Sequence, residues 1–156
     1  MYLLLSSLAL SQTLVRVVED NDALAPQRPT ADRWYSQGLG VSVSGGVDRL
    51  WELGLDQQVY TPWGIARGRP RPLERPWAGL LLTHGGWGRL GEHRLDSLRL
   101  DLGVLGPASL ASWGQEQVHQ AMPGLTLEPG GWDLQLDNEL LVNLRGDTCW
   151  RAAGPA

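Results

Sequence analysis

The sequence predicts an all-β protein made of antiparallel strands. Apolar and polar residues alternate along about six segments, and this period of two is typical of strands with one buried face. Polar or glycine-rich stretches separate the segments, and Gly45–Asp48 forms a turn that joins two of them into a hairpin. The predicted strands are residues 13–20, 33–44, 49–60, 77–87, 94–104 and 138–146.

Each predicted strand has one apolar face and one polar face. In residues 49–60, Leu53 and Leu55 share one face, and Glu52 and Asp56 share the other. In a soluble sandwich the apolar face packs on a second sheet, whereas in an outer-membrane barrel it meets lipid. The alternation alone leaves both architectures open.

The same alternation assigns a face to each residue of the segment 33–44. Ser36 falls on the polar face, and Tyr35, Leu39 and Val41 fall on the apolar face. In a barrel the polar face is the interior face. We therefore expect the Ser36 hydroxyl to point into the barrel.

Aromatic residues lie near the predicted strand ends. This placement favours the barrel, because a girdle of aromatic side chains marks each membrane interface. The chain has 8 Trp, and a Trp-rich soluble core is the alternative explanation. The residues concerned are Trp34, Tyr35, Trp51, Tyr60, Trp63, Trp77 and Trp87.

One short helix is expected within the long connection 105–135. The stretch Trp113–His119 does not alternate like a strand, and Ser112 stands at a capping-box spacing from Gln115. Gln115 and His119 are four residues apart, so they share one face of a helix. Two interpretations of His119 remain open here: a solvated helix residue, or a general base that takes a proton from water near neutral pH.

The stretch Glu-Asp-Asn-Asp at residues 19–22 follows the first predicted strand. Clustered carboxylate and amide oxygens suit Ca²⁺, which is a hard cation. Their spacing does not match an EF-hand loop, and an ordinary acidic turn is the alternative. His84 and His93 have no metal-ligand spacing around them.

Charge and chain ends constrain the function further. The net charge of -4 argues against a nucleic-acid partner, since such proteins usually carry a basic excess. Residues 1–12 have the apolar stretch and following small residues of a secretion leader; a first strand or a disordered leader is the alternative. We expect residues 13–150 to form the β domain and residues 151–156 a disordered tail. Cys149 is the sole cysteine, so no internal disulfide can form.

Taken in chain order, these pieces resemble one known family, the lipid A 3′-O-deacylases, which are calcium-dependent outer-membrane barrels. The resemblance covers most of residues 19–145 and rests on the order of several short stretches. They are EDND at 19–22, ADRWYSQGL at 31–39, YTP at 60–62, RPWAGLL at 75–81, LDLGVLGPAS at 100–109, GQEQVH at 114–119 and PGGWDLQL at 129–136.

The resemblance implies an antiparallel β-barrel in the cell outer membrane, with its site between the barrel wall and a loop helix. It implies a carboxylic ester hydrolase that removes an ester-linked acyl chain from lipid A. The expected partners are lipid A or lipopolysaccharide as substrate and the surrounding outer-membrane lipid.

The resemblance also implies catalytic residues. His119 matches the family's catalytic histidine, which activates a water molecule, and Gln115 matches a site glutamine. Ser36 stands where the family has a threonine and keeps the hydroxyl. Arg67, in the Pro- and Arg-rich connection 61–76, falls near a basic site residue of the family.

A calcium ion is the cofactor that the resemblance implies. Asn21 and Asp22 match the family's Asn-Asp pair that is associated with Ca²⁺. The ion would polarise the ester carbonyl and stabilise the oxyanion.

Length separates this chain from the family. Family members close with roughly twelve strands, whereas about six are predicted here, so we expect a partial barrel. An open half-barrel has two unpaired edges, which lipid does not tolerate; closure needs a C-terminal half or a second chain. The alternatives to the enzyme are an inactive truncated barrel and a secreted β-protein that binds a ligand.

Overall fold

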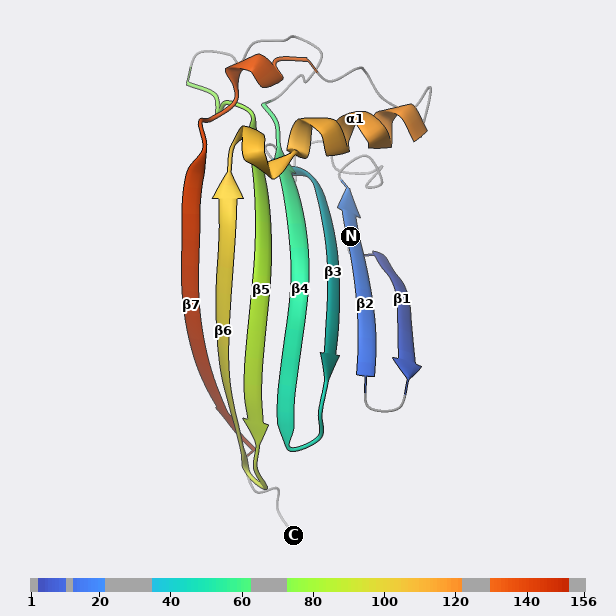
Figure 1. Ribbon diagram of the computed structural model, residues 1–156, viewed down its shortest axis with the longest axis vertical. Helices are drawn as coiled ribbons and strands as arrows, with labels where there is room; N and C mark the ends of the chain where they lie inside the picture. Colours follow the sequence, from blue (N-terminus) through green and yellow to red (C-terminus); the bar gives the residue numbers. More distant parts are fainter. Residues whose placement is uncertain (1–2, 11–12, 22–34, 63–72, 122–129, 152–156) are drawn as a thin grey trace.

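The computed structural model describes residues 3–10, 13–21, 35–62, 73–121 and 130–151. They form one antiparallel sheet in which every strand pairs with its neighbours in the sequence (Figure 1). The strands are β1 (Leu3–Leu10), β2 (Thr13–Asn21), β3 (Tyr35–Gly45), β4 (Arg49–Tyr60), β5 (Ala78–Leu90), β6 (Arg94–Leu105) and β7 (Glu139–Trp150). One helix, α1 (Ala111–Ala121), and two 3₁₀ turns, η3 (Pro107–Ser109) and η4 (Trp132–Leu134), lie between β6 and β7.

The six predicted strands are confirmed as β2 to β7. The alternation of apolar and polar residues predicts these strands because each strand has one apolar and one polar face. The pairing register keeps the apolar residues of neighbouring strands on the same face. Strand β1 was expected only as the alternative to a leader at residues 1–12; Leu3–Leu10 pairs with β2 at the edge of the sheet. The assignment of residues 1–12 as a secretion leader stays a prediction.

The two ends of the sheet differ in their connections. At one end β3 and β4 are joined by three residues, Gly46–Asp48, and β5 and β6 by residues 91–93. Gly46 has φ 104°, a left-handed conformation that suits glycine in so tight a turn. At the other end lie α1, η3 and η4 (Figure 1), where the segments that join β2 to β3, β4 to β5 and β6 to β7 are longer in sequence. Short turns at one end and long loops at the other are typical of outer-membrane barrels.

The sheet has a strongly apolar face. Its exposed side chains come from five strands and lie in register across them, which leaves a continuous apolar surface uncovered. They are Leu39, Val41, Trp51, Leu53, Leu55, Trp87, Leu98, Leu100, Leu102, Leu140, Val142 and Leu144. We call this the apolar face; the opposite, polar face carries Glu52, Asp56, His84, Arg99 and Arg145.

The apolar face has the height of a membrane. At the short-turn end Trp51 pairs with Trp87, and the next row carries the pair Arg89 and Asp96. Trp51 and Val59 enclose nine residues of β4, and a tilted transmembrane strand needs about 9–11 residues. The apolar band of an outer-membrane barrel is about 25 Å tall. The face therefore fits a lipid-facing wall with Trp51 and Trp87 at one interface.

The predicted aromatic girdle is present only in part. Trp51 and Trp87 are exposed on the apolar face, as expected. Trp77 is fully buried, with 0% of its surface exposed, because it lies where β5 begins beneath the segment that leads to β7. Its carbonyl accepts a hydrogen bond from the Leu136 N–H at 3.0 Å. Trp34 and Trp63 lie outside the described residues.

The sheet is open along its described strands, with β1 at one edge and β7 at the other. The fold class predicted from the sequence, an antiparallel partial barrel with one short helix in a long loop, is confirmed. Among the described helices, none combines the length and apolar character needed to cross a membrane.

The apolar face predicts that a charged substitution destabilises the membrane-inserted chain more within this face than in a short turn. Replacing Leu55, in the middle of the face, by Arg should lower the stability of the membrane-inserted chain by about 2–4 kcal/mol, the cost of Arg at the bilayer midplane. Val47→Arg, in the exposed short turn, is the matched control and should change little. The fraction of chain that resists urea extraction from outer membranes measures this. Equal extraction of the two variants would contradict a lipid-facing role for the apolar face.

Candidate active site

Helix α1 packs against the sheet through its smallest residues. A Cβ on Gly79 of β5 would collide with Ser109 Oγ and Ala111 Cβ, and a Cβ on Gly114 would lie 2.5 Å from Gln57 Oε1. Ser109 and Ala111 are buried in this contact. The helix therefore approaches the strands at backbone distance, which only glycine and other small residues permit.

Two hydrogen bonds fix the start of the helix segment. The Gly106 N–H donates to the Gly79 carbonyl at 2.8 Å, and the Gln57 amide Nε2 donates to the Ser109 carbonyl at 2.7 Å. Gln57, Val59 and Gly79 belong to the apolar side of β4 and β5 by register. Helix α1 therefore covers the loop end of the apolar face, outside the sheet wall.

Gln115 and His119 extend the contact stripe of α1. Residues four apart lie above one another on a helix, so Ala111, Gln115 and His119 form one stripe, which begins against Gly79. Gln115 is 3% exposed, and His119, in the last turn, is half-buried. This partial burial favours a His119 side chain that contacts the protein over one that is fully solvated.

The direction of α1 takes its later turns beyond its contacts with β4 and β5. In Figure 1 the helix runs from the ends of β4 and β5 across β3 in the direction of β2. From Ala111 to His119 it rises by about 12 Å at 1.5 Å per residue, which spans between two and three strands at about 4.8 Å spacing. The helix is therefore long enough to extend past β4 and β5, the two strands that it contacts.

The predicted capping role of Gln115 is wrong. Helix α1 begins at Ala111, so Ser112 lies inside the first turn and is not the N-cap. The Gly114 N–H instead donates to the Leu110 carbonyl at 2.9 Å. The Gln115 carbonyl oxygen Oε1 accepts a hydrogen bond of 2.9 Å from the indole Nε1 of Trp132. A tertiary contact, and not a local cap, holds this side chain.

Ser36 departs from the face assigned by simple alternation. A register shift interrupts β3 between Tyr35 and Gln37, and the Tyr35 hydroxyl lies where a Cβ on Gly38 would be. Tyr35 thus shares the polar face with Gly38, contrary to expectation, because the bulge inserts one residue into the alternation. The Ser36 hydroxyl is hydrogen-bonded to the hydroxyl of Thr61, directly after β4.

The predicted calcium residues are only partly described. Asn21 ends β2 and pairs with Gln37, which pairs in turn with Val59. This row meets α1 at Gly79, so the register places Asn21 at the helix-covered end of the sheet. Asp22 and Arg67 lie outside the described residues. Within the described part, no group of three or more His, Cys, Asp and Glu residues could hold a metal ion.

A charged cluster on the polar face was not predicted. The His84 ring lies between two carboxylates, with Nε2 3.2 Å from Glu52 Oε1 and Nδ1 2.9 Å from Asp56 Oδ2. Arg99 reaches the same carboxylates at 4.0 and 3.8 Å, and Gly54 leaves room for the ring. These residues come from three strands, so no local spacing reveals them. Arg99 thus places a positive charge near two carboxylates, as expected for a polar network that fills a barrel interior.

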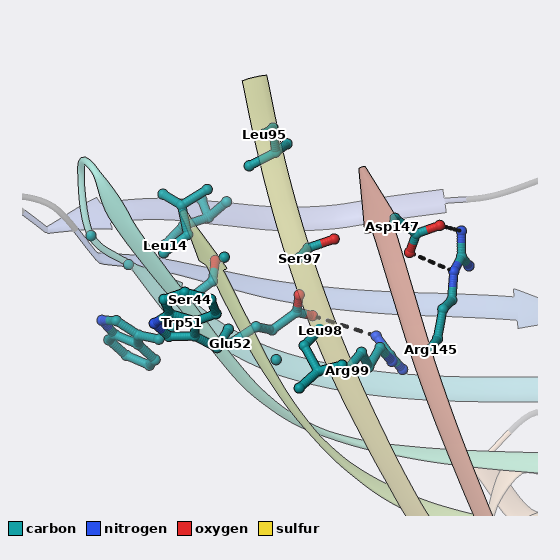
Figure 2. Close-up of a pocket in the computed structure, with 16 residues that line it drawn as sticks. Leu14, Ser44, Trp51, Glu52, Leu95, Ser97, Leu98, Arg99, Arg145 and Asp147 are labelled. Atoms are coloured by element: carbon teal, nitrogen blue, oxygen red, sulfur yellow. Dashed lines mark hydrogen bonds and ion pairs between the residues drawn. The ribbon is translucent and has the colours of Figure 1, made fainter. Parts of the chain in front are cut away.

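A cavity of about 490 Å³ lies on the polar face near the short turns. Figure 2 shows two ion pairs on its wall, between Glu52 and Arg99 and between Arg145 and Asp147. None of the three residues of the α1 stripe lines it. The predicted site and this cavity are therefore on opposite faces of the sheet.

The chain matches one family along almost its whole length. The model of the family described as outer membrane protein LpxR covers residues 1–155. The chain belongs to the LpxR family. This membership confirms the family resemblance seen in the sequence and the location in the outer membrane. It also argues against a soluble secreted protein.

A solved LpxR structure has the same fold. LpxR from Salmonella typhimurium is 22% identical in sequence, with a TM-score of 0.75 over 92% of this chain and 53% of that chain. The chain thus spans about half the length of that LpxR structure. No curated protein matches the sequence.

The close packing of α1 predicts an unequal response of two glycines on β5. Gly79→Ala should loosen the helix, since overpacking costs about 1–3 kcal/mol and the new methyl would collide with Ser109 and Ala111. Gly85→Ala is the control, because its methyl would meet only Leu53 at 3.6 Å. The rate of proteolytic cleavage between β6 and β7 should rise in the first variant alone. Equal rates would show that α1 does not depend on this contact.

Proposed function

We propose that this LpxR-family chain catalyses the calcium-dependent hydrolysis of an ester-linked acyl chain of lipid A, at the 3′-O position. The observation that carries the proposal is the position of the α1 stripe. Gln115 and His119 lie on a helix that covers the end of a lipid-facing wall. The geometry thus supports chemistry at the surface of the sheet rather than in its interior.

The depth of the site fits an acyl ester. The row of Val59 and Gly79 lies at the loop end of the apolar face, where the acyl region of the membrane gives way to the polar region. Ester bonds of a membrane lipid lie at this boundary, between the acyl chains and the sugar headgroup. Lipid A in the same membrane can therefore present its ester to α1 without leaving the bilayer.

His119 is the general base in this proposal. Its imidazole takes a proton from a water molecule, and the resulting hydroxide attacks the ester carbonyl carbon. When the tetrahedral intermediate collapses, the proton returns to the sugar oxygen as the C–O bond breaks. The products are a free fatty acid and a lipid A hydroxyl group, so one water is consumed for each acyl chain released.

Three other side chains assist the reaction in this proposal. The Gln115 amide nitrogen donates a hydrogen bond to the oxyanion. The Ser36 hydroxyl, hydrogen-bonded to Thr61, marks the β3 end of the site. Arg67 is proposed as a basic residue facing the substrate, on the family resemblance alone.

Asn21 and Asp22 are the proposed calcium ligands. Asn21 stands in the row of the sheet that α1 covers, and amide and carboxylate oxygens are the donors that Ca²⁺ prefers. A bound Ca²⁺ would supply positive charge that polarises the ester carbonyl. The donor chemistry and the position in the register support this assignment.

Substitution of the base tests the proposal. His119→Ala should reduce the release of acyl chains by at least about 100-fold, the lower range for general-base catalysis. His93→Ala, in the exposed turn at the opposite end of the sheet, should leave it unchanged. Mass spectrometry of lipid A from cells that express each variant measures the loss of one acyl chain. An unaltered lipid profile in all strains would instead support the inactive-barrel alternative.

Calcium removal provides a second test. Chelation with EGTA should abolish acyl release from outer-membrane preparations, and added Ca²⁺ should restore it. Asp22→Ala should raise the Ca²⁺ concentration needed for half-maximal rate, whereas Asp48→Ala, in a short turn, should not. Full activity in EGTA would exclude the metal from the mechanism.

A further inference from the structure

Trp132 makes a side-chain contact with the predicted site that the sequence did not suggest. It begins the 3₁₀ turn η4, between α1 and β7. Its indole Nε1 donates to Gln115 Oε1 at 2.9 Å. Gln115 is almost fully buried, so this hydrogen bond forms where water cannot readily replace it.

The segment that carries Trp132 is itself fixed. The Leu136 N–H donates to the Trp77 carbonyl at 3.0 Å, and the Asn138 side-chain oxygen accepts from the Ala108 N–H at 2.8 Å. The first bond ties the segment to the start of β5 and the second to η3. Trp132 is thus held against α1 by contacts that do not involve Gln115.

The hydrogen bond determines which way the Gln115 amide faces. An indole nitrogen can only donate, so it selects the amide oxygen and excludes the amide nitrogen. The nitrogen Nε2 must then point away from Trp132. Its two N–H groups are therefore directed away from the indole.

We propose that Trp132 is a positioning residue that fixes the Gln115 amide with its N–H groups toward the ester carbonyl. This inference rests on the proposed function of the α1 site. With Trp132 absent, the amide can rotate and present its oxygen to the developing oxyanion, which is repulsive. Trp132 acts through Gln115 and touches no reacting atom.

A double-mutant cycle on the full chain in outer membranes tests the coupling. Trp132→Phe removes the donor and should lower kcat about threefold to tenfold, the range of one lost hydrogen bond, with KM little changed. Gln115→Glu keeps the acceptor but lacks the amide nitrogen, and should lower kcat further. The double variant should match Gln115→Glu, because orientation no longer matters. Trp113→Phe, an exposed tryptophan of α1, is the control and should behave as wild type.

The proposal would be overturned if the double variant lost kcat by the product of the two single-variant factors, or if kcat were unchanged in Trp132→Phe. A purely structural role for Trp132 would lower kcat equally in both backgrounds.

A measurement independent of activity separates this proposal from the proposed function. The indole N–H of Trp132, assigned with Trp132→Phe, is followed by ¹⁵N NMR in detergent micelles. Its hydrogen exchange should be slow in wild type and in Gln115→Glu, and fast in Gln115→Leu, which has no acceptor. If lipid A is not hydrolysed but the indole responds in this way, the proposed function fails and the positioning contact stands. An indole that is indifferent to Gln115→Leu refutes the positioning role.

Discussion

The packing of α1 on the strand ends determines where the site can be. Gly79 lets Ser109 and Ala111 come within backbone distance of β5, and Gln57 secures the same turn through the Ser109 carbonyl. Once the first turn is fixed there, the 3.6-residue period decides that Gln115 and then His119 follow on the sheet side. A larger side chain at Gly79 would move every later residue of the helix away from the wall.

The two faces of the sheet separate two kinds of chemistry. Outside, apolar side chains meet lipid, and α1 covers only the end of that surface. Inside, the polar face pairs its charges among themselves, as Arg99 does with Glu52 and Asp56. The inner network holds charge that lipid would reject, while the outer helix holds the polar groups proposed to act on lipid. The register of strand pairing produces both faces, because it aligns apolar residues on one side of the sheet and charged residues on the other.

The strands and the helix could be predicted because their signals are local. Alternation located β2 to β7 to within a few residues, and the helical spacing of Gln115 and His119 is visible in seven letters of sequence. The features that the sequence predicted wrongly or missed depend on tertiary contacts. The bulge beside Ser36 breaks an alternation that the sequence continues without interruption. The partners of His84 come from neighbouring strands, and the partner of Gln115 comes from a turn beyond the helix, so no spacing rule links them. Asp22 and Arg67 remain predictions of the sequence alone.

The position of α1 outside the wall has a kinetic consequence. A substrate that meets such a site travels within the membrane plane, so its encounter rate depends on how many lipid molecules share a given area and not on a bulk concentration. Diluting the lipid with inert neighbours slows the search, whereas diluting the membranes in buffer does not. The enzyme proposed here would therefore sense the composition of the leaflet around it.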